Sequence, residues 1–215
     1  MSIIIERFDK IKFNINRLKP LKPVNIIAVS KTFSLSHIQP LIDVGHNHFG
    51  ENKVQEAMSK WNVIKNNFKF NLHMIGKLQS NKAKDAIKIF DYIHSLDNQK
   101  LADVLAKREI DLNKNLKYFI QVNIGNELQK SGIPVGELDA FYNYCTLEKN
   151  LNVIGLMVIP PNNKNSKKYF QSLNELNTSL ALSELSMGMS SDYMDAISSG
   201  ATYVRIGSSI FGSRD

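Results

Sequence analysis

Lys31 is the residue whose type and position most plainly suggest covalent chemistry. It directly follows Val24-Asn-Ile-Ile-Ala-Val-Ser30, a mostly apolar run rich in the β-branched residues typical of a strand. An amine at the end of such a strand is partly desolvated. Burial and nearby cations lower the pKa of a lysine and make it a nucleophile toward aldehydes. The alternative is a lysine that extends from the strand end into solvent, and its position alone leaves both interpretations open.

A second segment, Arg205-Ile-Gly-Ser-Ser-Ile-Phe-Gly212, has the composition of a phosphate-binding loop. A glycine and serines after a strand can offer backbone N–H groups to a phosphate, and Ser190, after the preceding strand, can add a hydroxyl. An ordinary Gly/Ser turn is the alternative. The chain has no Walker A motif and no Gly-x-Gly-x-x-Gly motif, so nucleotide binding lacks its usual support.

The histidines and the single cysteine offer weaker candidates. His46 and His48 alternate in a predicted strand, so they would share a face, and a metal site is conceivable. No third ligand stands at an obvious spacing, which favours structural or surface histidines. Because Cys145 is the single cysteine, the chain cannot form an intramolecular disulfide. Cys145 lies in a helical pattern, where we expect a small buried side chain rather than a reactive thiol.

Eight strand candidates alternate with segments whose apolar residues recur three and four positions apart. The predicted strands span residues 24–30, 46–51, 72–76, 92–96, 117–123, 153–159, 184–188 and 202–206. An amphipathic segment at residues 3–18 precedes the first of them. Asn98 and Ser191 stand at expected helix N-caps, and Pro134 suits the first turn of a helix.

This alternation predicts an α/β fold, a single (β/α)₈ TIM-type barrel with an extra N-terminal helix. Eight units of about 24 residues suit a closed barrel better than the competing doubly wound open sheet. The chain shows no internal repeat and no low-complexity linker, so we expect residues 1–215 to form one domain. A barrel would gather Lys31 and the 205–212 loop at the C-terminal ends of its strands.

Charge and hydropathy narrow the possible partners. The net charge is +7, but the lysines are dispersed and no basic run is interleaved with aromatic residues, which argues against nucleic-acid binding. No segment approaches the length of a membrane span, and the first residues lack the apolar core of a signal peptide. We therefore expect a cytoplasmic protein without membrane association.

Seven stretches, in order along almost the whole chain, resemble the YggS/PROSC family of pyridoxal 5′-phosphate (PLP) homeostasis proteins. They are Ala28-Val-Ser-Lys-Thr32, Phe49-Gly-Glu-Asn52, His73-Met-Ile-Gly-Lys-Leu-Gln-Ser-Asn-Lys82, Val122-Asn-Ile-Gly-Asn-Glu-Leu-Gln-Lys-Ser-Gly132, Gly155-Leu-Met157, Leu185-Ser-Met-Gly-Met-Ser-Ser-Asp192 and Val204-Arg-Ile-Gly-Ser-Ser-Ile-Phe-Gly212. Each motif is weak alone, and the ordered set is specific.

The resemblance implies a PLP-binding barrel like that of alanine racemases and the related decarboxylases, with a role for each matching residue. Lys31 matches the lysine that holds PLP as a Schiff base, and Arg205 matches an arginine facing the pyridine nitrogen. The phosphate site would comprise Ser190 and the backbone amides of Gly207 and Ser208. The residues that would line the ring pocket are Asn52, Met157 and Met189.

Two functions follow as alternatives. Arginine has no acceptor, so Arg205 would disfavour a protonated pyridine nitrogen and weaken PLP as an electron sink. Racemases also draw a second acid/base, a tyrosine, from another domain of a partner subunit, for which this chain has no residues. We therefore expect a carrier that buffers PLP and related B6 vitamers or delivers PLP to apo-enzymes, without robust catalysis. The family resemblance implies a monomer. The alternative is a PLP-dependent enzyme resembling an amino-acid racemase.

Overall fold

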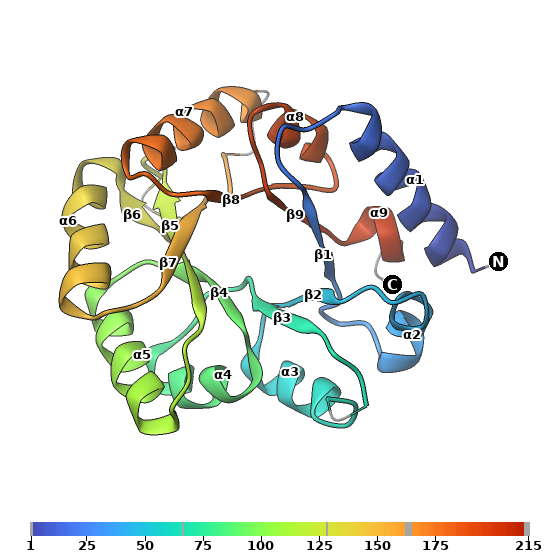
Figure 1. Cartoon of the computed structure of the whole chain (residues 1–215), viewed down its shortest axis with the longest axis horizontal. Coiled ribbons are helices and arrows are strands. Elements are labelled where there is room, and N and C mark those ends of the chain that lie inside the picture. The colour runs from blue at the N-terminus through green and yellow to red at the C-terminus, as the bar shows by residue number, and fades with distance from the viewer. Residues whose placement is uncertain (1, 66, 128, 162–164, 213–215) are drawn as a thin grey trace.

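In a computed structural model, the structure describes residues 2–65, 67–127, 129–161 and 165–212. Eight parallel strands form a closed barrel with helices around it, as predicted (Figure 1). The barrel strands are β1 (Asn25–Val29), β2 (His48–Glu51), β3 (Asn71–Met74), β4 (Tyr92–Leu96), β5 (Lys117–Asn123), β7 (Val153–Met157), β8 (Glu184–Met189) and β9 (Tyr203–Ile206). Pairing of β4 with β5 and of β1 with β9 closes the ring.

The helices cover the outer face of this barrel. They are α1 (Ile3–Arg17), α2 (Leu35–Asp43), α3 (Val54–Trp61), α4 (Ala83–Ile89), α5 (Gln99–Leu112), α6 (Leu138–Asn143), α7 (Ser166–Ser179), α8 (Tyr193–Ser198) and α9 (Ser208–Phe211). The predicted extra helix is α1, which packs against α2, α8 and α9 outside the sheet. Its buried residues Ile4, Phe8, Ile11 and Ile15 recur three and four positions apart, as expected for one apolar stripe.

Alternation along the strands divides the core into two layers. The larger layer lies between sheet and helices and contains Trp61 and Phe170. The smaller layer lies inside the barrel, where Ile27, Tyr92, Phe119, Met157 and Tyr203 form one cluster. Fully or nearly fully buried polar residues share this interior, namely His73, His94, Ser186 and Arg205.

Several local predictions are confirmed or corrected. Asn98 caps α5, since its Oδ1 accepts from the Leu101 N–H at 2.9 Å. The N-cap of α8 is Asp192 and not Ser191, because the chain makes one more turn residue after β8. Pro134 belongs to a two-residue strand, β6 (Ile133–Pro134), that pairs with β5 and precedes a 3₁₀ turn at Val135–Glu137.

The segment around Cys145 is helical, as predicted, but α6 continues into a π-helix at Tyr144–Glu148. Cys145 is fully buried, and burial raises the pKa of its thiol to about 12. The thiol is therefore protonated and shielded at neutral pH, which agrees with a packing role.

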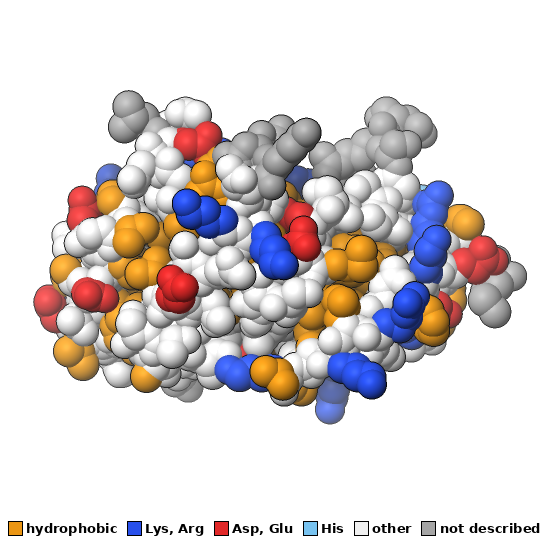
Figure 2. Space-filling view, turned by 90° about the horizontal axis from the view of Figure 1, so that it is seen from above, with side chains coloured by type: hydrophobic (Ala, Val, Ile, Leu, Met, Phe, Trp, Pro, Cys, Tyr) orange, Lys and Arg blue, Asp and Glu red, His pale blue; other side chains and the backbone are white. Residues whose placement is uncertain are grey.

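Charged side chains are scattered over the face that Figure 2 shows, with hydrophobic and acidic side chains between the lysines and arginines. This distribution agrees with the dispersed lysines of the sequence. Within the part of the chain that the structure describes, every helix is too short or too polar to cross a membrane.

Candidate functional site

A cavity of about 540 Å³ opens at the C-terminal ends of the strands. It brings together seven of the eight residues that the sequence singled out, although they lie as far apart as positions 31 and 208. These residues are Lys31, Asn52, Met189, Ser190, Arg205, Gly207 and Ser208. The cavity also includes Phe33, which lies outside the seven stretches, and Ile75, which lies within one of them but was given no role.

Met157 is the predicted residue that the structure does not place in the cavity wall. It ends β7, is 0% exposed and packs in the interior cluster with Phe119 and Tyr203. It is paired in register with Ser186. A contact between Met157 and a bound ring therefore stays a prediction.

The backbone turns sharply at Lys31. β1 ends at Val29, and the Phe33 N–H donates to the Ser30 carbonyl at 3.2 Å, which closes a turn around Lys31 and Thr32. Thr32 has a φ of 70°, a left-handed conformation that is unfavourable for a β-branched residue. The Glu56 carboxylate of α3 accepts a hydrogen bond from the Thr32 N–H and so holds this turn.

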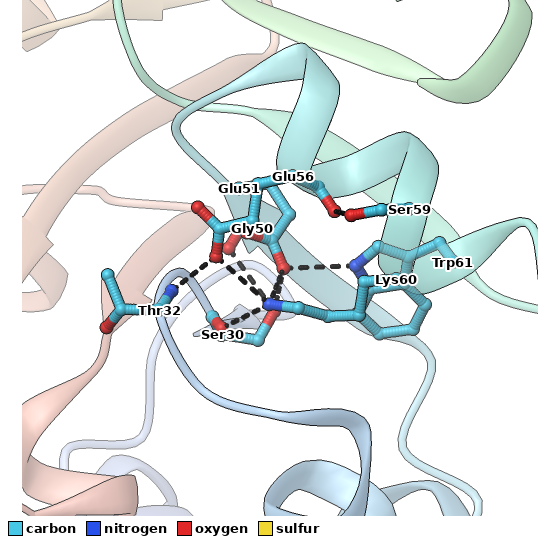
Figure 3. Close-up of polar contacts among 8 residues, drawn as sticks. All are labelled: Ser30, Thr32, Gly50, Glu51, Glu56, Ser59, Lys60 and Trp61. Carbon is cyan, nitrogen blue, oxygen red and sulfur yellow. Dashed lines mark hydrogen bonds and ion pairs between the residues drawn. The ribbon is translucent and has the colours of Figure 1, made fainter.

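A buried ion-pair cluster fixes the other side of Lys31 (Figure 3). Lys60, whose side chain is 8% exposed, donates to the Ser30 carbonyl at 2.8 Å and to Glu51 Oε1 at 2.9 Å. It also donates to Glu56 Oε1 at 3.2 Å. The same oxygen of Glu51 accepts from Ser30 Oγ at 2.8 Å and from Trp61 Nε1 at 3.0 Å. Helix α3 therefore holds the backbone both before and after Lys31.

Arg205 is a buried cation at the cavity wall. Its Nη1 donates to Ser186 Oγ at 2.7 Å and its Nη2 donates to the Val158 carbonyl at 2.8 Å. Both acceptors are neutral. Burial lowers the pKa of Arg205 to about 10, while the negative charge of Asp192 opposes the shift, so the guanidinium stays charged at neutral pH.

Ser190 joins the loops that follow β8 and β9. Its Oγ accepts from the backbone N–H groups of Gly207 and Ser209, both at 3.3 Å. The loop geometry depends on Gly188, whose φ is 89° and where a Cβ would lie 2.5 Å from the Ala196 side chain. The sequence had indicated Ser190 and Gly207, whereas the Ser209 amide carried no separate signal.

Asn52 and Ile75 wall the cavity from β2 and β3. They lie close together because Gly76 follows Ile75, and a Cβ at Gly76 would stand 2.4 Å from the Asn52 carbonyl oxygen. Only glycine permits this approach of the two loops.

The charge of the cavity is one-sided. Lys31 and Arg205 both line it, and no aspartate or glutamate is among the described residues of its lining. Hydroxyl and backbone N–H donors stand on the same wall as Arg205. This arrangement fits an anion, and the lysine adds a nucleophile for a carbonyl carbon.

The histidine pair does not form the shared face that alternation predicted. His46 precedes β2, and its ring contacts Phe8 and Phe49. His48 begins β2, and its Nδ1 lies 2.9 Å from His73 Nε2 inside the barrel. Over the described ranges, no group of three or more His, Cys, Asp or Glu residues is arranged to hold a metal ion.

Comparisons with known proteins agree with this geometry. The family model "Alanine racemase, N-terminal domain" matches residues 7–215. A pyridoxal phosphate homeostasis protein of Synechocystis sp. is 38% identical over 200 residues, which cover 89% of this chain and 92% of the relative. One of Aquifex aeolicus is 37% identical and covers 100% of this chain and 96% of its own length.

Solved structures show the same fold. PipY of Synechococcus elongatus, described with PLP bound, has a TM-score of 0.86 and 34% identity, with coverage of 98% of this chain and 100% of that chain. The alanine racemase of Bartonella henselae has a TM-score of 0.75 at 13% identity, and the match covers 99% of this chain and 60% of that one. At such low identity the second likeness shows the barrel alone.

Proposed function

We propose that this chain, which belongs to the family of pyridoxal phosphate homeostasis proteins, binds PLP on Lys31 and buffers or delivers the cofactor. The observation that carries the proposal is the cavity that Lys31 and Arg205 line, with no acidic residue among its described lining. PLP matches this donor set because it combines an aldehyde with a phosphate dianion. The names of the relatives and the PLP in PipY support the same assignment.

Each residue around the cavity would contact a different part of PLP. Lys31 would hold the aldehyde carbon as a Schiff base, and Arg205 would face the ring nitrogen. Ser190 Oγ and the amides of Gly207 and Ser208 would hold the phosphate. The hydrogen bonds that the Gly207 and Ser209 amides donate to Ser190 Oγ are long, at 3.3 Å, so a charged phosphate oxygen can replace them with shorter and stronger ones. Asn52, Met189 and Met157 complete the proposed ring contacts.

These residues favour retention of PLP over catalysis. When bound, PLP supplies an electrophilic carbonyl and an electron sink. Arg205 only donates hydrogen bonds, so it does not stabilise a protonated ring nitrogen and weakens that sink. The fixed turn holds Lys31 in the wall of the cavity.

The alternative racemase function needs a second acid/base across the ring from Lys31. Among the described residues that line the cavity there is no tyrosine, histidine, cysteine or carboxylate. The described lining therefore offers Lys31 for one face of the ring and none of these acid/base side chains for the other. We infer a monomeric cytoplasmic carrier, with PLP, related B6 vitamers and apo PLP enzymes as its partners.

The test compares transfer of PLP to an apo-enzyme with turnover of amino acids by the loaded protein. Protein loaded with PLP is freed of excess ligand and mixed with an apo PLP enzyme, and recovery of that enzyme's activity is followed. In parallel, the loaded protein is incubated with single L-amino acids and the appearance of the D-form is measured. We expect transfer without appreciable racemisation. Sustained racemisation by pure protein that is abolished in Lys31→Ala would refute the carrier function and support the racemase-like enzyme.

A further inference from the structure

Five polar side chains form a continuous hydrogen-bonded chain through the barrel interior. His48 Nδ1 lies 2.9 Å from His73 Nε2, and His73 Nδ1 lies 2.9 Å from His94 Nε2. His94 Nδ1 lies 2.8 Å from Ser186 Oγ, which accepts the 2.7 Å hydrogen bond from Arg205. These residues come from β2, β3, β4, β8 and β9, so the chain depends on closure of the barrel. Branched apolar side chains usually fill this space.

The hydrogen-bond chain runs from the cofactor cavity toward the N-terminal end of the barrel. Arg205 lines the cofactor cavity, whereas His48 lines a second cavity of about 330 Å³ beside Asn25 and Asn47, at the N-terminal ends of β1 and β2. His73, His94 and Ser186 between them are 0% exposed. Water therefore does not compete for the internal hydrogen bonds, and each unmade bond would be costly.

The imidazoles of the chain are neutral at neutral pH. Burial lowers the pKa of His73 and His94 well below the ordinary value, and burial together with Lys117 lowers the pKa of His48. The other ionisable groups that face these rings are Arg205, Lys117, His46, Tyr92 and Tyr203. Across the described residues, no carboxylate accepts a hydrogen bond from any of the three rings. Nothing in the interior thus favours an imidazolium.

Neutrality gives the chain a direction. A neutral imidazole has one donor and one acceptor nitrogen, and arginine only donates. Ser186 Oγ accepts from Arg205, so its own proton can point to His94 Nδ1. His94 Nε2–H then donates to His73 Nδ1, and His73 Nε2–H donates to His48 Nδ1. The reverse order would aim two donors at Ser186 Oγ and leave its proton in need of another acceptor.

We propose that His48, His73 and His94, together with Ser186, form a one-directional hydrogen-bond chain that positions Arg205 in the cofactor cavity. The chain presents lone pairs toward the guanidinium at every step, so its dipoles stabilise a buried cation whose direct acceptors are neutral. Ser186 and the histidines act through Arg205 and are positioning residues. This inference rests on the proposed function, because Arg205 is the group that faces PLP.

The first test needs no PLP. Ring-nitrogen chemical shifts of the three histidines are measured by NMR at neutral pH in wild type, Ser186→Ala and Ser95→Ala. Ser95 is the matched control, since it is 1% exposed on β4 and its hydroxyl has no hydrogen-bond partner in the described part of the chain. We expect neutral Nε2–H tautomers for His73 and His94 in wild type and in Ser95→Ala, and an altered His94 tautomer in Ser186→Ala. Nδ1–H tautomers or charged rings in wild type would overturn the proposal.

The second test measures PLP affinity by absorption titration in the same three proteins. Loss of the Ser186 acceptor should weaken PLP binding about tenfold or more, while Ser95→Ala stays within about twofold of wild type. Equal losses in both variants, in step with their unfolding midpoints, would show a structural role and refute the positioning role. If wild type bound no PLP, the proposed function would fail, and the NMR result would still decide whether the hydrogen-bond chain that ends on Arg205 is one-directional.

Discussion

At the scale of single residues, Ser190 does more than its place in a Gly/Ser-rich motif suggested. Its hydroxyl accepts from two backbone amides of the next loop, Gly207 and Ser209, at 3.3 Å each, and so orients two N–H groups beside the proposed phosphate site. Donors that are already oriented cost little further entropy when a phosphate binds.

Ser190→Ala should therefore weaken PLP binding without preventing the covalent link to Lys31. Removal of one protein hydroxyl that bonds to a charged ligand costs about 1.5–3 kcal/mol, which is roughly 10- to 150-fold in affinity. The measurement is PLP titration followed by visible absorption, with Ser198→Ala, an exposed serine on α8, as control. Unchanged affinity would remove Ser190 from the phosphate site.

The burial of His46 leads to a separate prediction about the pH dependence of stability. Burial lowers its pKa to about 4, and its Nε2 bonds to the His48 carbonyl at 2.8 Å. Between pH 6.5 and 4 the unfolded chain binds this proton and the folded chain does not. The free energy of unfolding should thus fall as pH falls through that window, by about 3 kcal/mol from this group.

His46→Gln keeps a donor for the carbonyl and removes the titration. Urea unfolding at pH 7, 6, 5 and 4 should show a shallower pH dependence in the variant, by about 1.4 kcal/mol per pH unit near pH 5. Parallel curves for the two proteins would show that the pKa of His46 is the same in the folded and unfolded states and would contradict the prediction.

At the scale of elements, helix α3 prepares the turn that carries Lys31. Glu56 bonds to the Thr32 N–H, and Lys60 bonds to the Ser30 carbonyl. Thr32 holds a left-handed conformation that costs of order 1 kcal/mol and persists because these contacts enforce it.

Glu56→Ala should release that turn and lower PLP affinity several-fold, with a loss of about 1–2 kcal/mol in stability from a partly buried, charged hydrogen bond. Asp85→Ala is the matched control, because Asp85 forms an exposed i,i+3 pair with Lys88 on α4 and such pairs contribute little. Affinity is measured by absorption titration and stability by urea unfolding. An equal PLP affinity in Glu56→Ala and wild type would show that the contact of α3 with the Lys31 turn does not contribute to PLP binding.

The same helix shows why part of the site escaped prediction. Glu56 and Lys60 stand four residues apart, the spacing of ordinary solvent-exposed helix pairs. Their burial arises from contact with the β1 loop, which helix periodicity does not report. By contrast, the strands that carry Lys31 and Arg205 were predictable, because their β-branched runs and the polar residues just beyond them follow from local sequence.

Met157 and the interior histidines also show which features of the site local sequence does not predict. The resemblance implies a contact between Met157 and the ring, which stays a prediction, and strand alternation places the Met157 side chain in the barrel interior beside Phe119. His73 and His94 lie within predicted strands, yet their contact with each other depends on register between strands, which no single segment encodes.

At the scale of the whole molecule, one closed sheet carries both the cofactor cavity and the polar interior beneath it. Closure pairs the first strand with the last, so no strand group has a core of its own. We expect residues 1–215 to behave as one domain. Circular dichroism and tryptophan fluorescence of Trp61 should report a single coincident unfolding transition in urea. Separate midpoints would indicate two independently stable parts.

The central claim is that Lys31 binds PLP covalently, and borohydride trapping tests it most directly. Purified protein is incubated with PLP, reduced, digested and mapped by mass spectrometry, with Lys31→Ala and, as control, Lys88→Met at an exposed position of α4 treated in parallel. We expect the visible chromophore to be fixed on the peptide that contains Lys31, in wild type and in Lys88→Met, and no fixed adduct in folded Lys31→Ala. A stoichiometric adduct on another lysine, or none in wild type with excess PLP, would contradict the account.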